Sequence, residues 1–147
     1  MANLYGVANP VPLPVVVSVG TSVVCPANTA TIFLTSPALV QPSQGYFYPI
    51  LWLTACINYG ATAPGLITIT AQIGAGSAFD TYVQGGIVLY DNSSQIVSVC
   101  LVGPLSQVTW QSPGSVVNVL CNPATNGVTM QQGPTRATFA LFRAPDQ

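Results

Sequence analysis

LITITAQI, the stretch from residue 66 to 73, decides the fold class. Its apolar residues Ile67, Ile69, Ala71 and Ile73 alternate with polar ones, which is the period-two pattern of a strand with one face in a core and one in water. Eight more stretches are short, rich in β-branched and aromatic residues, and bounded by Gly, Pro, Asn or Ser. They are residues 15–19, 29–36, 46–57, 81–90, 95–102, 106–111, 115–121 and 135–143. Strands at this spacing, without a helical period, predict an all-β sandwich or barrel.

Composition indicates a single domain with a substantial core. The 147 residues are 50% hydrophobic, and thirteen Gly and thirteen Pro divide the apolar runs into short pieces. The longest apolar run, at 46–60, contains Pro49 and falls short of the roughly 20 apolar residues that a membrane-spanning helix needs. The apolar residues 11–19 follow no basic segment and include two prolines. We therefore expect neither a transmembrane segment nor an ordinary secretion signal.

Ionisable side chains are almost missing from the chain. Only five residues carry a formal charge, and there is no Lys, Glu or His. The five are Asp80, Asp91, Asp146, Arg136 and Arg143. Acid-base catalysis, metal binding and phosphate capture depend on the missing types, and two Arg make no basic patch for nucleic acid. We expect no enzymatic activity, no catalytic residue, no cofactor, no metal and no nucleic-acid partner.

The same scarcity of charge predicts tolerance of acid and heat. Acid denaturation acts largely through carboxylates and His whose pKa values differ between the folded and unfolded states, and few such groups exist here. The expectation is a protein that withstands a hot, acidic exterior.

Asp80 and Asp91 are the one carboxylate pair within the predicted domain. A glycosidase needs two carboxyls flanking a bond, but both residues lie in or near predicted turns, where Asp commonly bonds backbone amides. The segments 91–94 and 112–114 are predicted to form hairpin turns. Asn92 begins an NSS sequon at the first of them, which is a glycan acceptor if the host modifies it and an ordinary turn residue otherwise.

The four cysteines are far apart and form no CxxC pair. Structural zinc usually has paired close ligands, so a zinc site is not expected. Four Cys allow three disulfide connectivities, and the sequence does not choose among these or between disulfides and buried thiols. The candidates are Cys25, Cys56, Cys100 and Cys121.

The stretch 50–57 is apolar on both faces. One face has Leu51, Leu53, Ala55 and Ile57, and the other has Ile50, Trp52 and Cys56. A sandwich buries only one face of each sheet, so something else covers the second: the N-terminal arm, a loop or another subunit. The predicted interface residues are Pro10, Pro12, Pro14, Ile50 and Trp52.

The succession of elements resembles a known architecture. PILWLTACINYG, PGLITITAQIG, a hairpin pair, SVVNVLCNP and TRATFALFR follow one another as in the single jelly-roll domains of viral capsid, vertex and decoration proteins, and trimeric domains of the TNF and C1q type share this rhythm. The resemblance covers most of 22–143. It implies a jelly-roll β-sandwich of about eight to nine antiparallel strands over residues 21–147, preceded by an extended arm at 1–20.

The resemblance also implies a sheet arrangement and an assembly. It places the strands starting near 29, 66, 106 and 135 in one sheet and those starting near 46, 81, 95 and 115 in the other. Proteins of this kind form trimers or pentamers around a symmetry axis.

We therefore expect a structural protein of the virion, made in the host cytoplasm. Its partners would be copies of itself, other capsid proteins and a host-surface glycan. One alternative is a carbohydrate- or receptor-binding spike module that uses exposed aromatic residues. Those residues would be Trp52, Trp110, Tyr46, Tyr48 and Tyr59. Another is a subunit of an extracellular filament that donates residues 1–20 as a strand to its neighbour.

Overall fold

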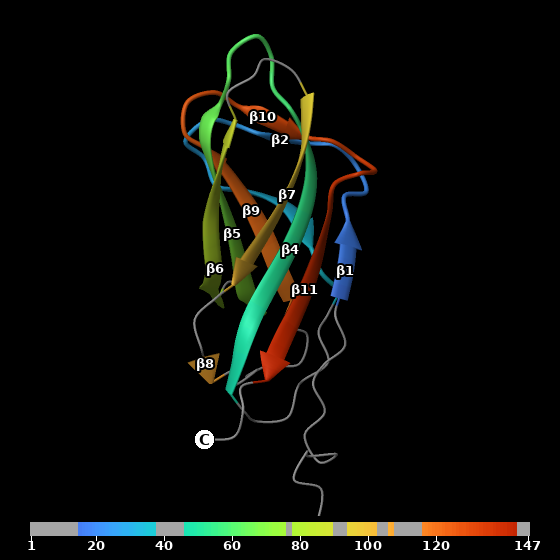
Figure 1. Cartoon of the computed structure of the whole chain (residues 1–147), viewed down its shortest axis with the longest axis vertical. Helices are drawn as coiled ribbons and strands as arrows, with labels where there is room; N and C mark the ends of the chain where they lie inside the picture. Colours follow the sequence, from blue (N-terminus) through green and yellow to red (C-terminus); the bar gives the residue numbers. More distant parts are fainter. Residues whose placement is uncertain are drawn as a thin grey trace, which may run out of the picture.

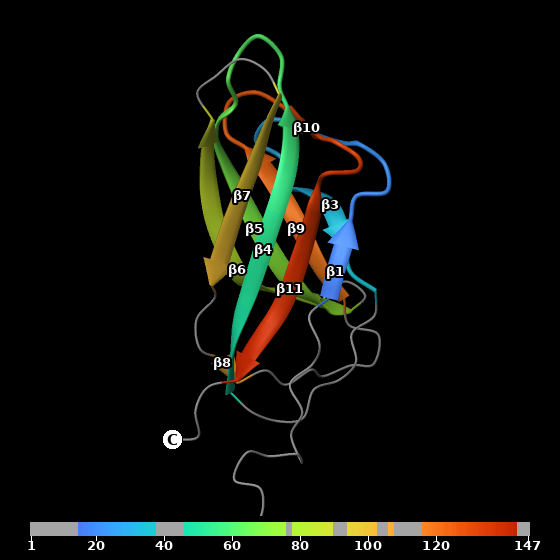
Figure 2. The same ribbon diagram turned by 45° about the vertical axis from the view of Figure 1, so that its right-hand side comes forward.

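The computed structural model describes the backbone of residues 15–37, 46–75, 78–89, 94–102, 106–107 and 116–143. Side chains are described at 18–37, 50–74, 86, 94–102 and 116–140. Every element in these ranges is a strand, and every strand pairing is antiparallel. The strands form two sheets that stack face to face (Figures 1 and 2).

Strand β4 (Tyr46–Asn58) is the centre of the larger sheet, which we call sheet A. Along one edge β4 pairs with the long β11 and then the short β10, and along the other edge with β7 and then the short β8. Beyond these lie β1, next to β11, and β2, next to β10. Their bounds are β1 (Val15–Ser18), β2 (Val23–Cys25), β7 (Ser94–Val102), β8 (Ser106–Gln107), β10 (Val128–Met130) and β11 (Arg136–Arg143).

The second sheet, sheet B, has the order β3-β9-β5-β6. Its strands are β3 (Thr31–Thr35), β5 (Gly65–Ala75), β6 (Ala78–Leu89) and β9 (Val116–Pro123). The main strands of sheet A have the order β1-β11-β4-β7, so the first strand lies beside the last, and the chain crosses between the sheets after each main strand except at the β5–β6 hairpin. That order is a jelly roll. The predicted fold class, a single jelly-roll β-sandwich, is confirmed.

Two predictions about pairing are wrong. Strands β6 and β9 lie in the sheet of β3 and β5, whereas β8 and β11 lie in the sheet of β4 and β7. The strands described on either side of these predicted turns lie in different sheets, β6 and β7 around the first and β8 and β9 around the second, while residues 91–93 and 112–114 themselves lie outside the described residues. In the described part of the chain, the tight hairpin joins β5 to β6, where Ala75 lies opposite Ala78. An alternating pattern is the same in either sheet, because partner choice depends on distant residues.

The sequence pattern also misses two strands. Among the described residues there are eleven, and the two unpredicted ones, β2 and β10, have three residues each and pair with each other. Strands this short carry no periodicity. The break between β10 and β11 along β4 is bridged by Cys56: its N–H donates to the Thr135 hydroxyl (3.0 Å), and its carbonyl accepts from the Gln131 N–H (2.8 Å).

The core lies between the two sheets and follows the predicted alternation. On β4 the fully buried set is the predicted one, and on β5 Ile67, Ile69 and Ala71 are fully buried while Ile73 is partly buried. Burying one such aliphatic side chain contributes about 1.5–3 kcal/mol. The core residues of β4 and β9 are Leu51, Leu53, Ala55, Ile57, Val117, Val119 and Cys121.

Strand β3 departs from simple alternation. Its register with β9 shifts between Ile32 and Leu34, which is an irregularity of the β-bulge kind. As a result the consecutive residues Phe33 and Leu34 are both buried, while Ile32 is exposed. After the strand, Ser36 continues the pairing: its N–H donates to the Val117 carbonyl (2.9 Å), and its hydroxyl accepts from the Val117 N–H (2.8 Å).

The N-terminal part of the chain enters the fold at β1. Val15–Ser18 pair with β11 as the edge strand of sheet A, in the stretch predicted to be a strand. Pro10, Pro12 and Pro14 lie outside the described residues, so the arm and the division at residue 20 stay predictions. Across the described ranges, no helix has the length and apolar character to span a membrane.

Candidate interaction faces

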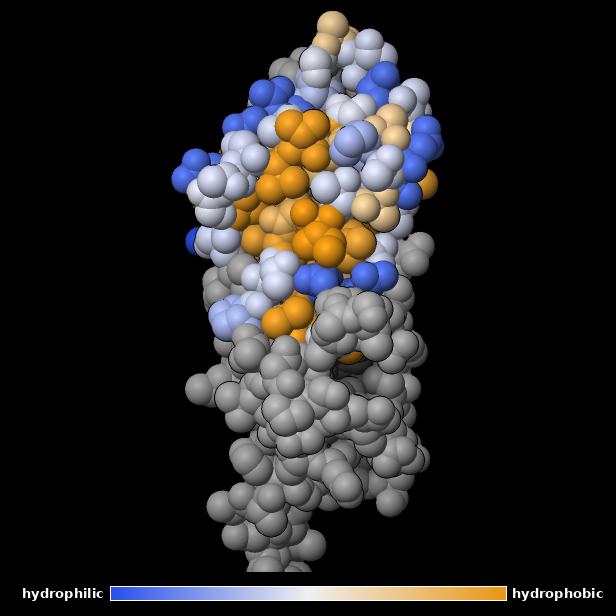
Figure 3. Space-filling model, turned by 180° about the vertical axis from the view of Figure 1, so that it is seen from behind, coloured by the Kyte–Doolittle hydropathy of each residue, from blue (hydrophilic) through white to orange (hydrophobic). Residues whose placement is uncertain are grey.

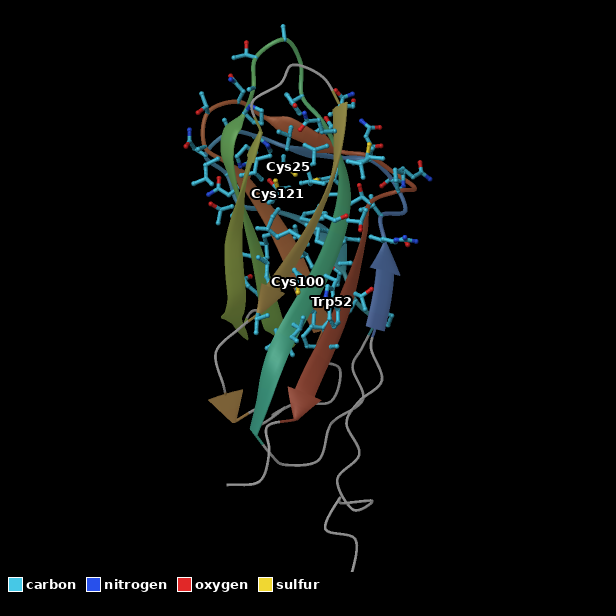
Figure 4. The ribbon with its side chains drawn as sticks, in the orientation of Figure 1. Cys25, Trp52, Cys100 and Cys121 are labelled. Carbon is cyan, nitrogen blue, oxygen red and sulfur yellow. The ribbon has the colours of Figure 1, made fainter. Side chains whose placement is uncertain are left out.

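The outer side of β4 is apolar and lies open to solvent. Its outward residues face outward residues of β7: Ile50 faces Val102, Trp52 faces Cys100, and Cys56 faces Ile96. Trp52 is 39% exposed, Ile96 67% and Val102 61%, whereas the inward side chains of β4 have no contact with solvent or almost none. Figure 4 shows Trp52 and Cys100 beside each other on the adjacent strands. We call this surface the β4 face: Ile50, Trp52, Cys56, Ile96, Cys100 and Val102.

A polar row crosses the β4 face. The hydroxyls of Thr54 and Ser98 are 3.3 Å apart and hydrogen-bonded. Arg136 of β11 lies opposite Thr54 on its other side and is exposed. Arg136 is the one charged residue among those whose side chains the structure describes. The row divides the face into a larger apolar part around Trp52 and a smaller one around Ile96.

The outer side of sheet B is also apolar over part of its surface. Ile32 of β3 lies opposite Leu120 of β9, and Ile32 and Leu66 of β5 are each 47% exposed. We call Ile32, Leu66 and Leu120 the β5 face. Figure 3, which shows the molecule from the side opposite to Figure 1, displays a continuous apolar area here.

Gly86 of β6 explains how Leu66 lies on the β5 face. A Cβ at Gly86 would come within 2.8 Å of Leu66 Cδ1. The leucine side chain therefore occupies the space that a side chain at position 86 would need. At the other end, the Thr35 hydroxyl donates to Asn118 Oδ1 (2.8 Å) across β3 and β9. This polar pair borders the apolar part of the face.

A gap between the sheets is too small for a ligand. Its volume is about 10 Å³, which corresponds to roughly one water molecule. It is lined mainly by aliphatic side chains of the two sheets, among them Leu34, Leu51 and Val119.

The four cysteines fall into two pairs. Cys25 and Cys121 are buried and lie close together between the sheets (Figure 4). Cys56 and Cys100 belong to the β4 face, where Cys56 is half-buried and Cys100 is exposed. All four are free thiols in the structure. Cys25 and Cys121 are therefore buried thiols, whereas Cys100 is not.

Those of the remaining candidate residues that the structure describes lie in separate places. The backbone of Asp80 lies in β6 opposite Ile73, close to the β5–β6 hairpin, and Arg136 and Arg143 are the first and last residues of β11. Tyr59 is 2% exposed and belongs to the core, so it cannot join a surface platform of aromatic residues. Tyr46 and Tyr48 lie on β4, but their side chains are outside the description. So are Asp91, Asn92, Trp110 and Asp146 as whole residues.

Half of the β4 face and the whole β5 face are not predicted by the sequence pattern. In the stretch 95–102 both sets of alternating positions contain apolar residues. One set has Ile96 and Val102, and the other has Val97, Val99 and Leu101. Only the pairing with β4 shows that Ile96 and Val102 are the outward ones. Ile32 is outward because of the β3 bulge, which no sequence signal marks.

A solved structure of Eiger TNF from S. frugiperda is similar to this chain, with a TM-score of 0.47 and 9% sequence identity over 94% of this chain and 96% of the other. No protein-family model matches the chain, and no curated protein matches it. At this level of similarity the likeness carries no functional argument. The strand order itself defines the chain as a single jelly-roll protein.

Proposed function

We propose that this chain is a non-enzymatic structural protein of a virus particle, which assembles with copies of itself through its outer sheet faces. The observation that carries the proposal is the β4 face, where Trp52, Ile96 and Val102 are exposed on the outside of a sheet. Large exposed apolar patches mark association surfaces. The jelly roll is a fold that viral capsid subunits use, although a fold alone does not establish a function.

The β4 and β5 faces lie on opposite sides of the sandwich. A subunit with one self-complementary face forms a closed dimer, whereas different contact surfaces on opposite sides allow rings, shells or filaments. Among the side chains that the structure describes near the two faces, Arg136 is the one charged group. Association through them would tolerate the loss of carboxylate charge in acid, which suits a particle in a hot, acidic exterior.

The size of the β4 face favours assembly through more than one surface. Strands β4 and β7 pair over nine residues. With β11 beside them, strand dimensions give a flat area of roughly 450 Å², about half of the ~800 Å² that each partner buries in a typical stable interface. The β4 face alone is smaller than a typical stable interface, so we expect subunits to use the β5 face as well and to form higher oligomers instead of a tight dimer.

The alternatives receive less support. A spike module for glycans needs several aromatic side chains exposed together, but Tyr59 is in the core and Trp52 lies on a strand within a sheet. A filament subunit that donates residues 1–20 would have to release β1, which pairs with β11 in its own chain. Both uses remain outcomes of the experiments below.

The test is an assembly assay with matched surface substitutions. Ile96→Asp places a carboxylate on the β4 face. Val24→Asp is the control, because it places a carboxylate on β2, two strands away from β4 and outside that face. The two side chains are 67% and 66% exposed, so their effects on folding are comparable. Native mass spectrometry and electron micrographs at rising protein concentration would show oligomers and ordered assemblies for the unmodified chain and Val24→Asp, and monomers for Ile96→Asp.

Two results would overturn the proposal. One is an unmodified chain that stays monomeric at high concentration near neutral pH and in acid. The other is equal assembly by Ile96→Asp and Val24→Asp. Specific binding on a glycan array by a monomeric chain would support the spike alternative instead.

A further inference from the structure

Cys25 and Cys121 lie close together in the core, one on each sheet. Cys25 ends β2 in sheet A, and Cys121 lies in β9 in sheet B. Both residues are wholly buried, and β2 and β9 contact each other although they belong to different sheets. Figure 4 shows the two side chains pointing into the same space between the sheets.

The local backbone holds both cysteines in place. Cys25 pairs with Val128, and Cys121 pairs with Thr31 on one side and Ile69 on the other. Close by, the N–H of Asn28 donates to the Pro123 carbonyl over 2.7 Å, which joins the segment after β2 to the end of β9. The two thiols therefore face each other from fixed strands.

The two thiols interact directly. The hydrogen bond from the Cys121 thiol lowers the pKa of Cys25, against burial, which raises it. The same contact and burial both raise the pKa of Cys121 far above its ordinary value. Cys25 is thus the sulfur that more readily becomes a thiolate, with a protonated thiol beside it.

We propose that Cys25 and Cys121 are the site of a disulfide that links sheet A to sheet B. The oxidant is a small-molecule disulfide such as oxidised glutathione. The thiolate of one of these two cysteines attacks one sulfur of the oxidant, forms a mixed disulfide and releases one glutathione thiolate. The other cysteine, after losing its proton, attacks the sulfur of the first cysteine and releases the second glutathione thiolate. Two protein thiols become one disulfide, and one oxidised glutathione becomes two reduced molecules.

Burial determines when this reaction occurs. Neither sulfur is accessible in the folded protein, so the exchange takes place during folding, before the sheets close over the pair. Afterwards the same burial protects the bond from reducing agents, because an attacking thiolate cannot reach it. The bond would then persist in a reducing compartment as long as the protein stays folded.

The stabilisation is expected to be large. The bond closes a loop of roughly 100 residues, and a longer closed loop restricts the unfolded chain more strongly. It also fixes the two sheets to each other inside the core. For a domain of this size we expect the linked protein to melt about 5–15 °C above the reduced form.

The experiment is refolding from urea with a glutathione redox buffer, followed by acid quenching. Intact mass should fall by about 2 Da relative to the reduced chain. Alkylation with iodoacetamide in denaturant should then label only Cys56 and Cys100. Digestion with pepsin at low pH, where exchange is suppressed, should yield one linked peptide pair that contains Cys25 and Cys121.

Matched substitutions separate this pair from the other two thiols. Cys100→Ser should retain the mass loss and the higher melting temperature, and Cys25→Ala should lose both. If Cys25→Ala does not fold, the linked peptides of the unmodified chain decide the assignment alone. Four alkylated cysteines after oxidative refolding, or a linked peptide that contains Cys56 or Cys100, would overturn the proposal.

Discussion

The two sides of β4 are both largely apolar in sequence but differ completely in their surroundings. Leu51, Leu53, Ala55 and Ile57 face sheet B and are at most 1% exposed. On the other side, Trp52 faces solvent although it is the largest apolar side chain of the strand. The comparison shows that apolar character alone does not say which side of a strand forms the core. A side that stays apolar and uncovered needs a partner outside the domain.

The largest difference between the sides should appear in stability. Leu53→Ala leaves a cavity between the sheets and should lower the free energy of unfolding by about 2–5 kcal/mol. Trp52→Ser removes an outer side chain and should change the stability of the monomer by less than about 1 kcal/mol. Urea denaturation of dilute protein measures both. Similar losses for the two variants would mean that the outer side is covered within the monomer.

The next largest effect concerns association. Trp52 is the aromatic residue of the β4 face, and aromatic anchors near the centre of an interface commonly contribute about 2–4 kcal/mol. Trp52→Ser should weaken self-association by roughly 30- to 1000-fold. Sedimentation velocity over a concentration series gives the dissociation constants. An unchanged constant, with assembly still sensitive to Ile32→Ser, would move the main contact to the β5 face.

The stability of the reduced protein should fall in alkali because of the buried Cys121 thiol. Unfolded Cys25 and Cys121 lose their protons near the ordinary pKa of 9.0, whereas the raised pKa of Cys121 keeps one proton in the folded state. The folded state then holds more protons, so stability falls as the pH rises above about 9, by about 1.4 kcal/mol per pH unit. Urea midpoints of the reduced protein from pH 8 to 10.5 measure this slope. Cys100→Ser should keep the slope, and Cys121→Ala should remove it.

The smallest effect should be that of acid. Protonation of the three Asp changes the formal charge only from −1 to +2. The free energy of unfolding should therefore vary by less than about 1 kcal/mol between pH 7 and pH 3. Melting curves at the two pH values, with Asp80→Asn as the matched control, measure the difference. A large fall in acid that Asp80→Asn abolishes would reveal a carboxylate with a structural role.

The sequence predicts those parts of the fold that depend on local pattern. The alternation at 66–73 correctly predicts the buried side of β5, and the two apolar sets of 50–57 correspond to the two sides of β4. The prediction fails where the outcome depends on distant residues: the sheet to which β9 belongs, the bulge at Ile32, and the outward set of β7. The meeting of Cys25 and Cys121 is of the same kind, since nothing in the spacing of four cysteines selects it.

Composition and local periodicity by themselves determined that this protein is an all-β domain with very few ionisable groups. The alternation of apolar and polar residues is visible in a few consecutive positions of the chain. The number of charged groups follows directly from the residue types present. The tertiary structure alone decided which strands share a sheet, which side of β7 faces solvent and which two thiols meet. Those outcomes are set by contacts between segments far apart in the chain, and no local pattern carries that information.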